Sequence, residues 1–100
     1  MATVSKALAR TAASTSSTTL YTVPSSTTAV VTNVLVANTA STAATFDLSL
    51  DDVQIANDVS VAANSLTVID LKQVLAQNKT IKGLASATTV NFHISGVEIA

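Results

Sequence analysis

The sequence predicts an all-β protein, a sandwich of two antiparallel sheets with about seven or eight short strands. Runs rich in Val, Thr and Ile recur along the 100 residues, and β-branched side chains favour strands. Turn residues separate these runs about every eight to twelve positions, the spacing typical of sandwiches and barrels. No segment is long enough for the helix of a β-α-β crossover, which excludes a parallel α/β fold. Jelly-roll-like and immunoglobulin-like topologies both stay open.

Residues 1–16 carry two basic side chains and no acidic one. They have room for one short helical turn around Val4 and Leu8, and small hydroxylated residues follow. We expect this stretch to be an N-terminal arm that is ordered only where a neighbouring molecule holds it. Residues 17–100 would then form the sandwich domain.

The central strand is predicted at Thr28–Asn38, the longest β-branched run, because it is apolar on both faces. We assign Val30, Val34 and Val36 to the face that looks into the core. A strand over Thr18–Val23 precedes it and ends at a proline turn. Next, the clean alternation of Ala44–Leu50 predicts a half-buried antiparallel strand.

The second half of the chain predicts five further strands and one helical turn. The turn lies at Lys72–Gln77, where helix-favouring residues cluster but are too few for an independent helix. Gly83 indicates a bulge or a close backbone approach, and Val97–Ile99 extends the last strand past Gly96. The strands are expected at Val53–Ala56, Val59–Ala62, Ser65–Leu71, Thr80–Ala85 and Thr88–Ser95.

The apolar faces of these strands predict one core. Its expected members are Leu20, Val30, Val34, Val36, Phe46, Leu48, Leu50, Leu66, Val68, Ile81, Val90, Phe92 and Ile94.

The low charge of the chain is its most informative compositional feature. Charged residues make up 11% of the sequence, against about 25% in a typical soluble domain. Ser and Thr supply 28 residues in their place, and the net charge is −1. Free monomers usually cover themselves with Lys and Glu for solubility. We therefore expect partners to cover much of this surface, and the alternative is a Ser/Thr-coated monomer.

We expect no catalytic, cofactor-binding or metal-binding residue and no enzymatic activity. His93 is the single histidine, and catalysis would need it beside a nucleophile and an orienting acid; the alternative is a surface or interface histidine. The sequence has no cysteine and no phosphate-binding glycine loop. Two basic residues in the arm do not indicate nucleic-acid binding. No apolar run is long enough for a membrane helix, and we expect no signal peptide.

The acidic residues define two further hypotheses. Asp51, Asp52 and Asp58 flank a short segment and could offer oxygen ligands to a cation, or they are solvated turn acids. Asp47 and Asp70 lie within strands. They could form salt bridges with Lys or Arg of a neighbouring subunit, or they lie on a solvated face.

Several segments resemble a family of small virion structural proteins of tailed phages. The likeness covers about residues 17–99, and the order of the segments carries it. Where family members often have Ala-Gly after the proline, this chain has Ser25-Ser26, and where they often have Gly-Asp it has Asn78-Lys79. The matching segments are Leu20–Pro24, Thr27–Val31, Val36–Thr39, Ala43–Phe46, Leu75-Ala76 and Thr80–Ser86.

The resemblance implies a β-sandwich component of the phage particle, present in several copies. A capsid decoration (cement) protein, usually a trimer seated on the major capsid protein, is the function we expect. A tail, neck or fibre subunit is the alternative, and a glycan-binding adhesin module is a weaker one. In each case the partners would be copies of the chain itself and other virion proteins.

Overall fold

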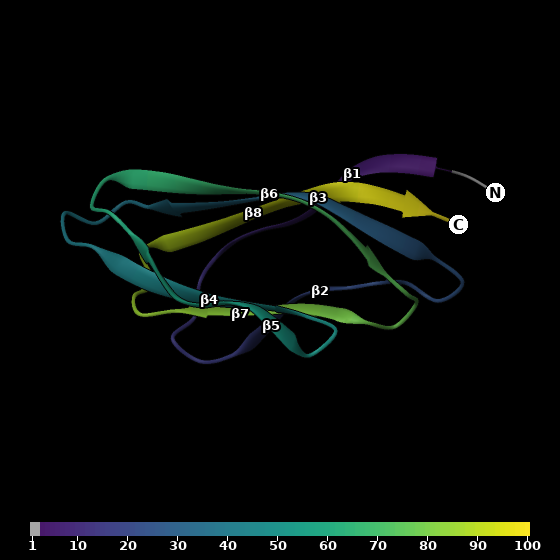
Figure 1. Cartoon of the computed structure of the whole chain (residues 1–100), viewed down its shortest axis with the longest axis horizontal. Helices are drawn as coiled ribbons and strands as arrows, with labels where there is room; N and C mark the ends of the chain where they lie inside the picture. Colours follow the sequence, from purple (N-terminus) through teal and green to yellow (C-terminus); the bar gives the residue numbers. More distant parts are fainter. Residues whose placement is uncertain (1–2) are drawn as a thin grey trace.

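A computed structural model describes residues 3–100, which form eight β-strands and no helix (Figure 1). No helix in this range could therefore cross a membrane. The strands are β1 (Thr3–Ala12), β2 (Thr18–Thr22), β3 (Thr28–Asn38), β4 (Ala44–Leu50), β5 (Val53–Val61), β6 (Ser65–Leu75), β7 (Thr80–Ala85) and β8 (Val90–Ile99).

The strands form two four-stranded antiparallel sheets, one above the other in Figure 1. The first sheet has the order β1-β8-β3-β6 and the second has the order β2-β7-β4-β5. The first four strands pair with the last four in reverse order, namely β1 with β8, β2 with β7, β3 with β6 and β4 with β5. The predicted antiparallel sandwich is confirmed, and it is elongated, at 45 × 21 × 18 Å.

The bounds of β3, β4 and β7 match the prediction, and two other segments differ from it. The two short strands expected after Asp52 are one strand, β5, whose register against β4 shifts twice. The helical turn expected at Lys72–Gln77 is wrong, because β6 stays paired with β3 as far as Leu75. Gly83 brings no register shift of its own but is closely approached, since a Cβ there would lie 3.3 Å from the Asp47 carbonyl oxygen.

The N-terminal segment also differs from the expected arm. Within the described part of that segment, Thr3–Ala12 is strand β1, paired with β8 along most of its length. The helical turn expected around Val4 and Leu8 is therefore wrong, and the Leu8 side chain is buried in the core. The first two residues of the predicted arm lie outside the described range.

The core lies between the two sheets, and most of its predicted members are buried. Phe46 from the second sheet meets Phe92 from the first, with ring centroids 6.1 Å apart in an edge-to-face arrangement. Leu20 packs against this core from a half-buried position. The confirmed buried members are Val34, Val36, Phe46, Leu48, Leu50, Ile81, Val90, Phe92 and Ile94.

Three predicted core residues lie outside the core. The pairing of β3 with both neighbours shifts between Val31 and Asn33, so the strand buries Val31 before this point and Val34 after it. Val30 therefore faces outward. On β6, Ile69 pairs with the buried Val34 and faces the core, which leaves Leu66 and Val68 on the outer face.

Asparagine, aspartate and serine residues adopt left-handed backbone in several turns, which explains how a fold of eight strands uses only two glycines. The β4–β5 hairpin turns through Asp51 and Asp52 alone, with φ angles of 53° and 60°. Positive φ at both central residues defines the tight type I′ turn, which suits hairpins. Ser26, Asn64 and Asn78 adopt the same region, and Asn and Asp tolerate it better than other non-glycine residues.

Candidate functional site

The outer face of the β1-β8-β3-β6 sheet carries the largest set of exposed apolar side chains. Leu66, Val68 and Val74, all on β6, are 50–68% exposed and are three of the six exposed large hydrophobic residues described. Their cross-strand partners on β3 are also apolar. We call this surface the apolar face, and it consists of Val30, Leu35, Ala37, Leu66, Val68 and Val74.

The outer face of the other sheet has a different composition. Its outward positions on β4 are Thr45, Asp47 and Ser49, and the residues opposite them on β5 include Gln54 and Ser60. The second sheet also exposes two large apolar side chains, Val53 and Ile55, near the start of its edge strand β5, but its outward positions on β4 are polar and well solvated. Contiguous exposed apolar surface, by contrast, is typical of sites that another molecule covers. The difference between the faces therefore marks the apolar face as the candidate binding surface.

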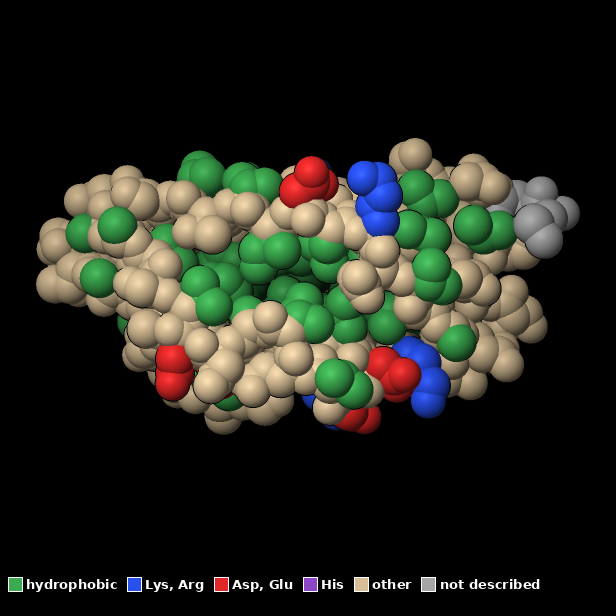
Figure 2. Space-filling view, in the orientation of Figure 1, with side chains coloured by type: hydrophobic (Ala, Val, Ile, Leu, Met, Phe, Trp, Pro, Cys, Tyr) green, Lys and Arg blue, Asp and Glu red, His purple; other side chains and the backbone are tan. Residues whose placement is uncertain are grey.

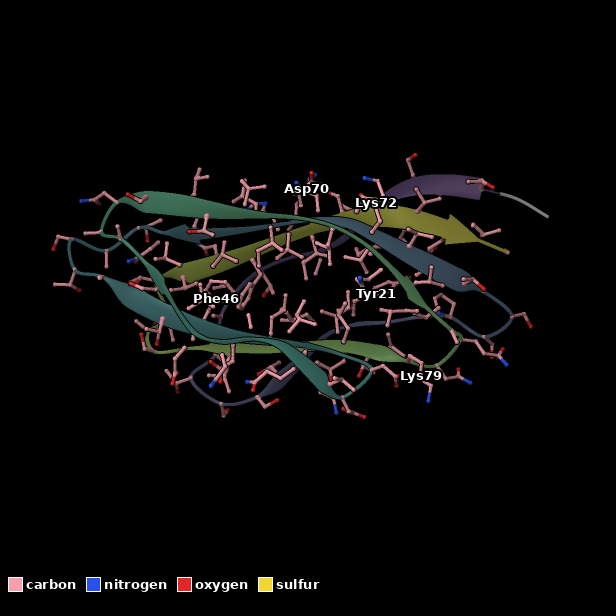
Figure 3. All side chains as sticks on the ribbon, viewed as in Figure 1. Tyr21, Phe46, Asp70, Lys72 and Lys79 are labelled. Carbon is pink, nitrogen blue, oxygen red and sulfur yellow. The ribbon has the colours of Figure 1, made fainter. Side chains whose placement is uncertain are left out.

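Two opposite charges lie within the apolar face. Asp70 and Lys72 alternate with the exposed valines of β6, and both point away from the space between the sheets (Figure 3). Neither forms an ion pair within residues 3–100, where the ion pairs are Lys6–Glu98, Lys79–Asp51 and Lys82–Asp52. They are thus free to pair with groups on another molecule.

The side of the sandwich between β5 and β6 exposes part of the core. Figure 2 shows hydrophobic side chains in a hollow between the two sheets, flanked by tan polar surface. Val59 on β5 and Ile69 and Leu71 on β6 pack against the core there but stay only partly buried. Both strands are the outermost members of their sheets. This hollow continues the apolar face around the β6 edge.

A broad depression extends the apolar face at its other boundary. It has a volume of about 630 Å³ and is lined by Ala37 and Leu66 of that face together with Asn38 and Asn64. Asn38 is almost fully buried, and its side-chain amide donates to the Thr42 carbonyl oxygen at 2.9 Å. This hydrogen bond ties the end of β3, at the edge of the depression, to the loop that follows it.

The structure separates the other residues that the sequence singled out. His93 is exposed on the apolar side of the first sheet, opposite Arg10 on β1 and Leu35 on β3. Asp47 lies on the outer face of the second sheet, where its Oδ1 accepts a hydrogen bond from the Asp58 backbone N–H at 2.7 Å. The histidine and these acids therefore belong to different faces and form no common site.

Asp51 and Asp52, the two residues of the β4–β5 turn, form ion pairs with lysines just before and on β7. The Lys79 Nζ lies 3.5 Å from Asp51, and the Lys82 Nζ lies 2.8 Å from Asp52. The hydrogen bond from Lys82 and its positive charge lower the pKa of Asp52. Asp58 is not part of this group, and residues 3–100 contain no cluster of three side chains that could hold a metal ion.

A polar group links the two sheets near the end where β8 terminates. The Tyr21 hydroxyl on β2 donates a hydrogen bond to Glu98 Oε2 on β8, and the Lys6 Nζ on β1 lies 3.2 Å from Glu98 Oε1. Burial and the adjacent carboxylate raise the pKa of Tyr21 well above its usual value. The hydrogen bond from Tyr21, with a further contribution from Lys6, lowers the pKa of Glu98.

We expect Glu98→Gln to reduce the loss of stability in acid. Because the folded-state pKa of Glu98 is lowered, its stabilising contribution is present above the unfolded value of about 4.3 and is lost as pH falls through the folded value. Urea unfolding at pH 7 should give a free energy of unfolding about 1 kcal/mol lower for the variant than for the wild type. This difference should be smaller at pH 3. Equal pH dependence in the two proteins would show that this carboxylate does not stabilise the fold.

Comparison with protein-family models and with curated proteins found no match to this chain.

Proposed function

We propose that this chain is a structural protein of a tailed-phage particle, and most specifically a decoration protein that stabilises the head shell. The observation that carries the proposal is the apolar face. It is broad, it lies on one side of an elongated sandwich, and it belongs to a chain with only 11% charged residues. A subunit of this kind is suited to being covered by its neighbours in a permanent assembly.

The order of the strands supports a role in a virus. We infer that the reversed pairing of the first four strands with the last four is a jelly roll, in which one long hairpin is rolled into two sheets. Eight-stranded jelly rolls occur in viral capsid proteins, but also in lectins and cupins. Because a fold alone does not define a function, the choice among these rests on the surface and on the sequence resemblance.

The proposed mechanism is mechanical. The apolar face would lie across a joint between copies of the major capsid protein and bury area that the free subunit exposes. Burial of apolar area gains about 25 cal/mol per Å² before the cost of association. If the joint has the matching shape only in the expanded shell, the added contacts favour that state and help it to resist internal pressure.

A tail, neck or fibre subunit is the second candidate. The long axis of 45 Å favours it, as does the pairing of the start of β1 with the end of β8 at one end of the molecule (Figure 1). If the subunit is attached at this end, its opposite end projects from the attachment point. The partners would then be copies of the chain and other tail proteins.

The adhesin hypothesis receives less support from the side chains. Glycan-binding surfaces commonly use exposed aromatic rings, which stack on sugars. The chain has three aromatic residues: Phe46 and Phe92 are fully buried, and Tyr21 is half-buried with its hydroxyl bound to Glu98.

The test is to count and locate the protein in purified phage particles. The decoration hypothesis predicts copies in a number comparable to that of the major capsid protein, and gold-labelled antibodies over the head. A few copies with label at the tail or neck would instead establish the second candidate. Absence of the protein from washed, infectious particles would refute both.

A further inference from the structure

Strand β6 is a free edge of unusual length. It has eleven residues, and it is the outermost strand of its sheet, with β3 on one side and no described strand on the other. Natural proteins usually protect such an edge with proline, with bulges or with unpaired charge. The β6 sequence SLTVIDLKQVL has no proline and no glycine, and its two charges are opposite in sign. Its pairing with β3 shifts register between Asp70 and Gln73, but the side chains of Asp70, Lys72 and Val74 all stay exposed. No described strand pairs with the far side of β6, so this edge can pair with another strand.

The arrangement of β6 side chains is complementary to itself. Residues directly opposite each other in an antiparallel pair lie on the same face of the sheet. When a strand pairs with its own copy, the outer faces of the two copies therefore match only if one residue lies opposite itself, at the two-fold axis. With the axis at Leu71, Asp70 of each copy lies opposite Lys72 of the other. In the same register Val68 lies opposite Val74. The charged pairs and the valine pairs all lie on the outer face of the sheet.

Neighbouring registers lack this match. An axis through Asp70 would place two aspartates opposite each other, and an axis through Lys72 would oppose two lysines. Like charges directly opposite on paired strands are destabilising, whereas opposite charges and apolar pairs stabilise. Among these three registers, the one centred on Leu71 alone places opposite charges, and two valines, directly across from each other. We therefore expect β6 to pair in this register.

The other edge strands do not offer such a match. The charged residues of β1 are Lys6 and Arg10, which have the same sign, and β2 has none. The single charge of β5 is Asp58. Only β6 among the edges of the described sheets combines both signs with exposed valines.

We propose that two copies of the chain associate through their β6 strands, antiparallel and centred on Leu71, so that the two four-stranded sheets become one sheet of eight. The occupant of the β6 edge is thus a second copy of this chain. The pairing also brings together the partly open hollows beside Ile69 and Leu71, which lie on the inward side of the same strand. Two ion pairs between Asp70 and Lys72, one in each direction, fix the register.

This inference is independent of the proposed virion function, because it concerns the isolated chain. It differs from the trimer that the family resemblance implies, since a two-fold contact builds assemblies from pairs. Much of the apolar face also stays free in the dimer and could still bind the capsid.

The test uses charge exchange at the two positions, with mass measured by light scattering across micromolar concentrations. Both residues are exposed and have no partner within residues 3–100, so the variants should fold, which circular dichroism checks. The single variants Asp70→Lys and Lys72→Asp place like charges opposite each other at two points. The double variant Asp70→Lys with Lys72→Asp restores opposite charges in the same register.

The wild type should have a mass of about 20 kDa, twice the 10.1 kDa of one chain. Each single variant should raise the dimer dissociation constant at least about tenfold, and the double variant should return it to within about threefold of wild type. A wild-type monomer or trimer would overturn the proposal. So would a dimer that the single variants leave intact, or one that the double variant fails to restore.

Discussion

Replacing Phe46 with alanine is expected to destabilise the protein by about 3–5 kcal/mol, the range found for large aromatic residues deleted from a core. The ring is fully buried and packs edge-to-face on Phe92, the one aromatic contact between the two sheets in the described range. Its loss leaves a cavity at the centre of the sandwich and removes this contact, which adds to the cost. Because a domain of this size has a total stability of only about 5–15 kcal/mol, the variant should melt many degrees lower.

Chemical denaturation of Phe46→Ala measures this effect, and Val53→Ala is the matched control. Val53 is 66% exposed, so its truncation should change stability by no more than about 0.5 kcal/mol. If the two variants unfold at the same denaturant concentration, the assignment of Phe46 to the core of the sandwich is wrong.

Gly96→Ala should be nearly as damaging, at about 3 kcal/mol or more. A Cβ at this position would lie 2.3 Å from the Val30 carbonyl oxygen and 2.8 Å from Leu8 Cδ1. Gly96 lies on β8 beside the points where the pairing of β1 and of β3 shifts register, so the neighbouring strands approach unusually closely. A methyl group would force β3 away from the middle of the sheet.

Gly83→Ala provides the control for this prediction. A Cβ there would lie 3.0 Å from Leu20 Cδ1, the end of a flexible side chain, and 3.3 Å from the Asp47 carbonyl oxygen. A small shift of the leucine relieves most of the overlap, and the lower entropy of the unfolded chain offsets part of the rest. We expect a loss of about 1 kcal/mol or less; a greater loss for Gly83→Ala than for Gly96→Ala would contradict the described packing of the first sheet.

The sequence predicts local alternation well and the relation between strands poorly. Ala44–Leu50 alternates apolar and polar residues, so both its bounds and its buried face were predicted correctly. On β3 both faces are apolar. Because the register shifts after Val31, the residues that face the core are odd-numbered before the shift and even-numbered after it. Such a shift depends on pairing with β6 and β8, which are distant in the sequence, so the local pattern cannot show it.

The errors on β1 and β6 have a related cause. Thr3–Ala12 has few large apolar residues, and its strand conformation depends on hydrogen bonds to β8, at the other end of the chain. The segment after Leu71 contains helix-favouring residues, but pairing with β3 overrides that propensity as far as Leu75.

The candidate site could be predicted only in part. A salt bridge from Asp70 to a neighbouring subunit was among the hypotheses from the sequence. The edge position of β6 depends on the order of strands in the sheet. The outward orientation of Leu66 and Val68 depends on which alternate residues of β6 face the core. The local sequence determines neither. The alternation of Leu66, Val68, Asp70, Lys72 and Val74 was nevertheless visible, and it is the signal that could have revealed the face.

The central claim is that other protein covers the apolar face when the chain is assembled. Because the chain has no cysteine, a single one can report on each outer face: Val68→Cys on the apolar face and Ser60→Cys, also exposed, on the polar face of the other sheet. Maleimide labelling of unfolded chains gives the common reference rate. In intact phage particles we predict rapid labelling of Ser60→Cys and strong protection of Val68→Cys. Equally rapid labelling of both would show that both outer faces are in contact with water and would contradict the account.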